Sequence, residues 1–122
     1  MLARADRLTA GRDFSETIRR GRRAGARSLV VHLDVGRADA HTPEDRPRAG
    51  FVVARSVGPA VTRNRVKRRL RHVVRPHLTA LPVRSRLVVR ALPAAASASS
   101  DQLERDLRRA LERARPVGGE GA

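Results

Sequence analysis

Residues 63–71 place six basic side chains in nine positions and read Arg-Asn-Arg-Val-Lys-Arg-Arg-Leu-Arg. The two apolar residues, Val66 and Leu70, are four positions apart, and Val73 and Val74 continue this spacing. Residues three or four positions apart share one face of an α-helix. The segment therefore predicts a helix that buries an apolar stripe and presents fixed cations to a polyanion.

The cations of this helix should form three adjacent rows opposite the apolar stripe. Helical spacing gives the rows Arg63, Lys67 and Arg71; Asn64, Arg68 and His72; and Arg65 and Arg69. An Asn near the helix start can hydrogen-bond a sugar or a base edge, and the free backbone amides there favour phosphate. The simpler alternative is a solvated charged face or a nonspecific basic tract. The embedded apolar stripe favours a folded, positioned helix.

The charge of the whole chain also indicates an anionic partner. The 122 residues carry a formal net charge of +15, and the sequence pI is about 12.0. No acidic residue lies between Asp45 and Asp101, whereas this stretch holds thirteen Arg or Lys. An anionic partner relieves such self-repulsion; nucleic acid is the commonest, and a membrane surface is second. Nearly all of these cations are Arg, which binds phosphate bidentately. A GC-rich coding bias would explain the preference for Arg over Lys, but it would not explain why this stretch has no acidic residue.

Composition also limits the compartment and the chemistry. Without cysteine, structural disulfides and thiolate metal sites are excluded. No apolar run approaches the roughly 20 residues that span a bilayer, and the N-terminus lacks an apolar signal core. We expect a cytoplasmic protein with no membrane partner.

A self-contained enzyme is poorly supported. The acid-free stretch offers no carboxylate as a base or metal ligand, and no Gly-rich phosphate loop is present. The histidines show no metal-ligand spacing; they are His32, His41, His72 and His77. We expect no catalytic side chain and no metal bound by protein side chains alone.

The remaining patterns predict the elements that position the basic helix. Helices are expected over 12–20, from a cap at Thr62 to 75, where Pro76 follows, and over 101–114 after a cap at Ser99 or Ser100. Strands are expected over 28–35, 48–55 and 86–92, with a flexible loop at about 36–47 and a linker at 93–100. These elements make one α+β domain with two layers over residues 1–115, and 116–122 form a disordered tail.

A second candidate surface combines Phe14 and Ile18 with one face of the first strand. Their spacing places both on one side of the first helix. They can be core residues that attach the helix to the sheet, or they can line a groove if the helix covers the sheet only partly.

The basic segment resembles the signature of the bacterial ribonuclease P protein component. The matching residues are Gly58 and then Ala60-Val61-Thr62-Arg63-Asn64-Arg65-Val66-Lys67-Arg68. Shorter matches are Asp6-Arg7-Leu8, Asp13-Phe14, Gly50-Phe51-Val52-Val53 and Leu87-Val88-Val89-Arg90. The resemblance covers roughly residues 6–114, and its Arg-Asn-Arg-x-Lys-Arg core is specific because a strand and a Gly turn precede it.

This resemblance implies a fold and a function. Members of the family are αβββαβα proteins with a left-handed crossover around the basic helix, an exception to the usual hand. The patterns above give one strand fewer, so one strand is unplaced. The RNA subunit and its Mg²⁺ ions carry out catalysis, and the protein helps to bind precursor tRNA as the 5′ leader is removed. The resemblance allows holoenzymes to associate further.

The resemblance also assigns residues to two surfaces. The residues that would face the catalytic RNA are Arg63, Asn64, Arg65, Lys67, Arg68 and Arg71. Those that would line a cleft for the single-stranded leader are Phe14, Ile18, His32 and Arg55. Related proteins often carry aromatic residues where Ile18 and His32 stand, and stacking on an aromatic ring contributes about 1–3 kcal/mol per base. We therefore expect either that leader contacts here depend more on Arg stacking and phosphate pairing, or that the leader selectivity differs.

Three other functions remain as alternatives. A ribosomal or other structural RNA-binding protein would share the charge and the Arg-rich helix. A DNA-binding helix-turn-helix protein would need a second helix a short turn before residue 62, where a strand and Gly58-Pro59 stand instead. An autonomous nuclease would need a carboxylate cluster near the basic helix.

Overall fold

The computed structural model describes residues 6–8, 11–35 and 46–115 of the chain. The elements in chain order are α1 (Gly11–Arg20), β1 (Arg22–Gly25), β2 (Leu29–Asp34), β3 (Arg48–Val52), the 3-10 turn η2 (Arg55–Val57), α2 (Ala60–Leu78), β4 (Arg86–Ala91), the 3-10 turn η3 (Pro93–Ser97) and α3 (Ser100–Ala114). The predicted αβββαβα order and α+β class are confirmed. The expected tail at 116–122, and all of the expected loop but residues 46 and 47, lie outside the described residues.

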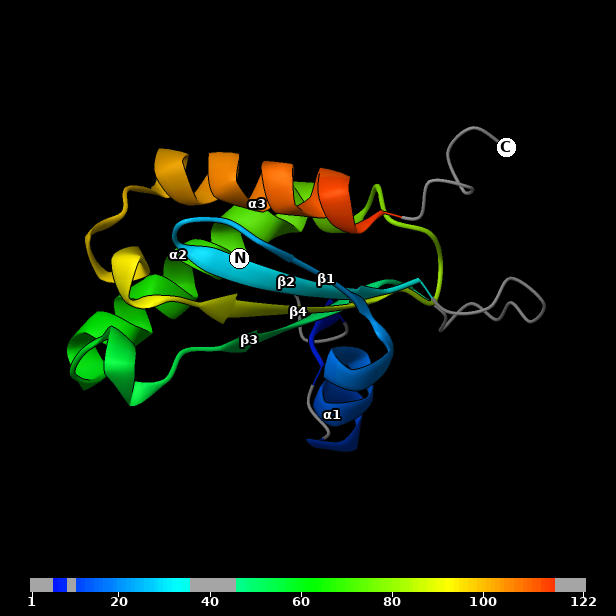
Figure 1. Cartoon of the computed structure of the whole chain (residues 1–122), viewed down its shortest axis with the longest axis horizontal. Coiled ribbons are helices and arrows are strands. Elements are labelled where there is room, and N and C mark those ends of the chain that lie inside the picture. Colours follow the sequence, from blue (N-terminus) through cyan, green and yellow to red (C-terminus); the bar gives the residue numbers. More distant parts are fainter. Residues whose placement is uncertain (1–5, 9–10, 36–45, 116–122) are drawn as a thin grey trace.

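The strands form one sheet in the order β1-β2-β4-β3. The β1–β2 and β2–β4 pairs are antiparallel, whereas β3 and β4 are parallel neighbours. Parallel neighbours need a crossover connection, and α2 provides it. In Figure 1, α3 lies along one face of the sheet and α1 lies on the opposite face.

The hydrophobic core lies between the sheet and the layer formed by α2 and α3. The predicted stripe on α2 is confirmed, because Val66, Leu70 and Val74 are fully buried. Leu103 and Leu107 of α3 are equally buried and belong to the same cluster. This packing fixes how α2 is rotated, and so which of its cations face outward.

The strand that the sequence patterns did not place is β1, at the edge of the sheet. It reads Arg-Arg-Ala-Gly, and only Ala24 is buried. One buried residue leaves no alternation that could distinguish a strand from a turn. The strand exists because its backbone pairs with β2, with Arg23 opposite His32.

The predicted ends of α2 were wrong at both termini. Thr62 is not the cap: the helix begins at Ala60 after Pro59, whose φ of −67° and ψ of 170° are extended. The helix also continues through Pro76 to Leu78. Leu78 is buried, and its packing offsets the backbone hydrogen bond that a proline cannot make.

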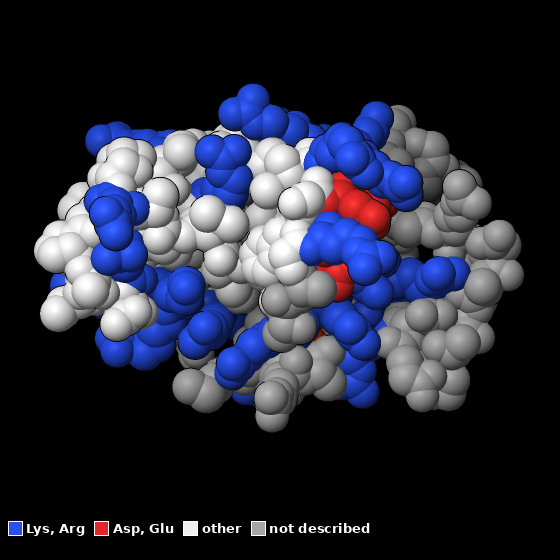
Figure 2. All heavy atoms as spheres, turned by 90° about the horizontal axis from the view of Figure 1, so that it is seen from below, with Lys and Arg blue, Asp and Glu red and all other residues white. Residues whose placement is uncertain are grey.

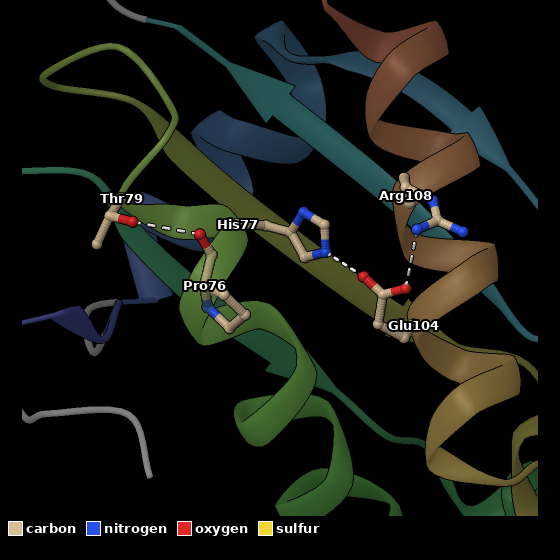
Figure 3. Close-up of polar contacts among 5 residues, drawn as sticks. All are labelled: Pro76, His77, Thr79, Glu104 and Arg108. Carbon is tan, nitrogen blue, oxygen red and sulfur yellow. Dashed lines mark hydrogen bonds and ion pairs between the residues drawn. The ribbon is translucent and has the colours of Figure 1, made fainter.

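A polar contact connects the C-terminal turn of α2 to α3. The Nε2 atom of His77 lies 2.5 Å from Oε2 of Glu104, whose other oxygen lies 3.5 Å from Nη1 of Arg108 (Figure 3). At the start of α3, Ser99 caps the helix, and its side chain and that of Gln102 form a capping box. Ser99 was one of the two predicted caps.

All three predicted strands are shorter in the structure than expected. β3 ends at Val52, and Arg55 lies in the turn η2 instead of a strand. The predicted linker at 93–100 contains η3. Within the described ranges, no helix is both long enough and apolar enough to cross a membrane.

Candidate nucleic-acid interface

The outer face of α2 exposes one of the three predicted rows. Asn64, Arg68 and His72 are all exposed along the helix. Lys67 and Arg71 are half-buried at one flank of this row. The exposed row and this flank form a continuous polar and cationic surface on a helix whose opposite side is locked in the core.

Three other arginines of α2 bind backbone carbonyl groups. Arg65 donates from Nη2 to the Ala96 oxygen at 3.0 Å, and Arg69 donates from Nη1 to the Ala98 oxygen at 2.9 Å. Both acceptors lie in the segment between β4 and α3. Arg63 donates from Nε to the oxygen of Gly58 at 3.2 Å. These arginines therefore hold the surroundings of α2 in place as well as adding positive charge.

Gly58 is required in the turn that precedes α2. Its φ of 153° lies in a region that side chains rarely adopt, and an added Cβ would lie 3.1 Å from Thr62 Cβ. The turn lets the chain leave η2 and enter the helix with its first cations at the surface.

A small cavity lies where the exposed row of α2 meets the start of α3. Its volume is about 350 Å³, and its lining residues are Arg68, Arg69, His72 and Ser100. Two guanidinium groups beside a helix N-terminus favour an anion. The cavity suits a phosphate group.

The second candidate surface lies where α1 packs against the sheet. An added Cβ on Gly50 of β3 would lie 2.6 Å from Cε1 of Phe14, so the ring rests directly on the strand. Thr17 is buried, Phe14 is half-buried, and Ile18 is 38% exposed. Phe14 thus contributes to packing and keeps part of its ring accessible, while Ile18 faces outward.

The side chain of His32 lies on the face of the sheet that α1 partly covers. Strand pairing aligns it with Arg23 on one side and with Val88 and then Gly50 on the other. It is 3% exposed, and within the described part of the chain neither ring nitrogen has a hydrogen-bond partner. Burial, and secondarily Arg90 and Arg23, lower the pKa of His32 below its usual 6.5. The ring is therefore neutral near pH 7.

Arg90 belongs to this surface, although the site predictions left it out. It is half-buried, lies opposite Val30 and Val52 in the strand register, and acts on His32. The alternation of Leu87, Val89 and Ala91 with outward residues in the strand could have identified it.

The predicted leader residues do not all lie together. α1 places Phe14 and Ile18 on the same side of the sheet as His32. Arg55 is exposed on η2, and in Figure 1 the chain runs away from α1 after β3 to reach it. Seen from below the view of Figure 1, Lys and Arg side chains surround a central area of uncharged residues, and acidic side chains occupy one small region (Figure 2).

The described residues contain no group of three or more His, Cys, Asp or Glu side chains that could hold a metal ion.

Comparisons with known proteins agree with one another. The family model for Ribonuclease P matches residues 2–115. A Nocardioides protein named ribonuclease P protein component is 58% identical over 120 residues, which cover 98% of this chain and 97% of that protein. A Streptomyces bikiniensis protein of the same name is 56% identical over 116 residues, covering 93% and 94%.

Solved structures are similar as well. The RNase P protein of Staphylococcus aureus aligns with a TM-score of 0.75 at 25% identity, covering 90% of this chain and 95% of that one. The Thermotoga maritima RNase P protein, at 24% identity, has a TM-score of 0.70 over 90% of this chain and 98% of its own, which supports the fold. The chain therefore belongs to the ribonuclease P protein family, the protein partner of the RNase P RNA in a tRNA-processing endoribonuclease.

Proposed function

We propose that the chain binds the catalytic RNA through α2 and the 5′ leader of precursor tRNA through the surface between α1 and the sheet. In this way it assists the Mg²⁺-dependent, RNA-catalysed removal of the leader in the cytoplasm. The observation that carries the proposal is the rotation of α2, which is fixed by its buried stripe so that Asn64, Arg68 and His72 face outward.

The α2 surface suits the backbone of a structured RNA. Each cation that neutralises a phosphate releases counterions and adds a salt-dependent increment of affinity. Lys67 and Arg71 border the exposed row, and the cavity at Arg68 and Arg69 can take one phosphate. The remaining predicted contacts, Arg63 and Arg65, reach RNA only through the donors that their carbonyl bonds leave free.

The α1 surface suits a single strand. Proteins bind unpaired nucleotides by combining stacking surfaces with cations along the backbone. Phe14 and Ile18 provide the apolar part and Arg23 and Arg90 the positive charge, while the neutral ring of His32 lies buried beneath them. Arg55 lies farther along the chain's path and would meet a more distant part of the leader.

In this proposal the RNA subunit carries out the hydrolysis. The Mg²⁺ ions are held mainly by the RNA subunit, since the described side chains supply no cluster of metal ligands. The protein binds, orients and neutralises charge.

The test is reconstitution with a bacterial RNase P RNA at low Mg²⁺ concentration. The chain should increase cleavage of precursor tRNA over the RNA alone, and the holoenzyme should bind precursor tRNA more tightly than mature tRNA. Unchanged cleavage would overturn the proposal, and co-sedimentation with ribosomal subunits would then favour a structural RNA-binding role. Equal affinity for precursor and mature tRNA would overturn the leader surface alone.

A further inference from the structure

A polar pocket of about 260 Å³ lies beside the segment that connects β4 to α3, whose carbonyl groups bind Arg65 and Arg69. The turn between β1 and β2 forms one wall, and the first two turns of α3 form another. Its volume falls just below the roughly 300–1,000 Å³ of most small-molecule sites. The polar residues that line it are Arg27, Ser28, Ser97, Gln102, Arg105 and Asp106.

Two hydrogen bonds from Ser28 hold the Asp106 carboxylate in the lining of this pocket. Its Oδ2 atom accepts hydrogen bonds from Ser28 Oγ at 2.5 Å and from Ser28 N at 3.2 Å. The carbonyl of Ser28 in turn accepts from Leu92 N at 2.8 Å. Because both bonds from Ser28 use Oδ2, the other carboxylate oxygen, Oδ1, remains outside this pair and can accept from a ligand.

The remaining polar groups offer donors around that oxygen. Arg27 and Arg105 are exposed at the pocket, one on the turn and one on α3. The amide oxygen of Gln102 accepts from Ser99 N at 3.0 Å, which leaves the amide NH₂ group to donate. The pocket thus combines one fixed acceptor with two cations.

This combination selects a ligand that carries both an anion and N–H donors. A bare phosphate would pair with Arg27 and Arg105 but would offer Asp106 no donor, and a cation would be repelled by the two arginines. A nucleotide satisfies both, because its phosphate pairs with guanidinium groups and the amino group of its base donates to a carboxylate. The net charge of +15 favours a polyanion over a zwitterionic metabolite.

We propose that this pocket binds one unpaired nucleotide of an RNA, with its phosphate between Arg27 and Arg105 and its base edge on Asp106. Adenine, cytosine and guanine carry an exocyclic amino group that can donate to Oδ1. Uracil presents carbonyl oxygens on either side of a single N–H, and these oxygens would face the carboxylate. The pocket therefore prefers amino-bearing bases to uracil.

The position of the pocket connects it to the basic helix. Arg65 and Arg69 bind the carbonyls of Ala96 and Ala98, and Ala98 also lines the pocket. In Figure 1 the segment leading into α3 lies beside the turn between β1 and β2, away from α1. An RNA docked on α2 could reach the pocket without crossing the surface proposed for the leader, so the two proposals can fail separately.

The test is an NMR titration of the ¹⁵N-labelled full chain with AMP, CMP, GMP, UMP and inorganic phosphate. The first three nucleotides should shift the backbone amides of Ser28 and Gln102 in a saturable way, and UMP should bind several-fold more weakly. Equal shifts with inorganic phosphate would overturn the proposal in favour of a simple anion site. If UMP binds as tightly as the other nucleotides, the proposed contact between the base edge and Asp106 is wrong.

A matched pair of variants separates the pocket from general electrostatics. Arg105→Ala and Arg109→Ala each remove one exposed cation from α3, but only Arg105 lines the pocket. Loss of one charge-assisted hydrogen bond should weaken CMP binding by about tenfold in Arg105→Ala, with less than a twofold change in Arg109→Ala. Equal losses in the two variants would show that the pocket plays no part.

Discussion

Replacing Arg68 with Ala should weaken binding of the RNase P RNA and leave the fold intact. Arg68 is exposed in the middle of the outer row of α2, between Asn64 and His72. Truncation of this outward side chain should not disturb Val66 and Leu70, which lie two positions away and are buried in the core. Exposed substitutions of this kind change stability by no more than roughly 0.5 kcal/mol.

The magnitude follows from counterion release. One neutralised phosphate contributes about 0.9 to the slope of log K against log salt concentration on a duplex. If Arg68 neutralises one phosphate, the variant's slope is shallower by about 0.9. Its loss of affinity relative to the native chain then shrinks about 3.5-fold as KCl rises from roughly 50 to 200 mM, because a fourfold change in salt is raised to the power 0.9.

The assay is a binding titration of the full chain with RNase P RNA over that range of KCl at fixed Mg²⁺. Arg109→Ala is the matched control, since it removes one exposed cation from α3. A slope equal to that of the native chain, or the same change in both variants, would refute a direct phosphate contact by Arg68. Thermal melting of both variants checks that the fold is intact.

Arg65→Ala makes a contrasting variant on the same helix. It removes the donor to the Ala96 carbonyl, which should lower the free energy of unfolding by about 1 kcal/mol. A urea melt indistinguishable from that of the native chain would show that this hydrogen bond does not stabilise the fold.

Three further substitutions test the packing and the buried ring. His77→Ala should lower the free energy of unfolding by about 1 kcal/mol in urea melts, since it removes the partly exposed contact with Glu104. Gly50→Ala should lower it by about 1–3 kcal/mol, because the added methyl group displaces the Phe14 ring; a neutral effect would contradict the close packing. His32 has a lowered pKa, so the unfolded chain binds more protons and the native chain loses stability as pH falls through 6.5. His32→Phe should remove this part of the pH dependence, measured by melts between pH 8 and 5.5.

Controls for these substitutions come from the same elements. Thr79→Ala removes an exposed, local hydrogen bond to the carbonyl of Pro76 near the end of α2 (Figure 3), so it should change stability less than His77→Ala. Gly11→Ala adds a methyl group in α1 where nothing lies within 4 Å, and it should not destabilise the protein.

Periodic patterns predicted the elements that depend on burial of one face. The stripe of Val66, Leu70 and Val74 located α2, because its repeat matches the turn of a helix, and the cap at Ser99 or Ser100 located the start of α3. The edge strand β1 was not predicted because it is stabilised by backbone pairing with β2. Its four residues have a single buried side chain, so they show no pattern of burial that indicates a strand. Pro76 misled the prediction of the end of α2, since a proline disfavours a helix locally but tertiary packing of Leu78 retains it.

Cleft residues were harder to predict than the helix because they come together only through strand register. The family resemblance assigned His32 to the cleft, but its burial and its alignment with Arg23 and Val88 depend on the pairing of β2 with both neighbours. Arg90 could have been found from alternation within its own strand. Its closeness to His32 required knowing that β4, and not β3, lies beside β2.

Helical periodicity predicts where the cations of α2 lie around the helix, but it does not predict which of them donate hydrogen bonds within the protein. Arg65 and Arg69 form one row in the sequence, and both point to carbonyls of the segment that enters α3. A residue pattern cannot predict these contacts, because every amino acid carries the same backbone carbonyl acceptor. The division of the basic face therefore depends on where a later part of the chain crosses the helix. That crossing leaves Asn64, Arg68 and His72 exposed, so RNA affinity should be more sensitive to Arg68 than to Arg69, although both are arginines one position apart.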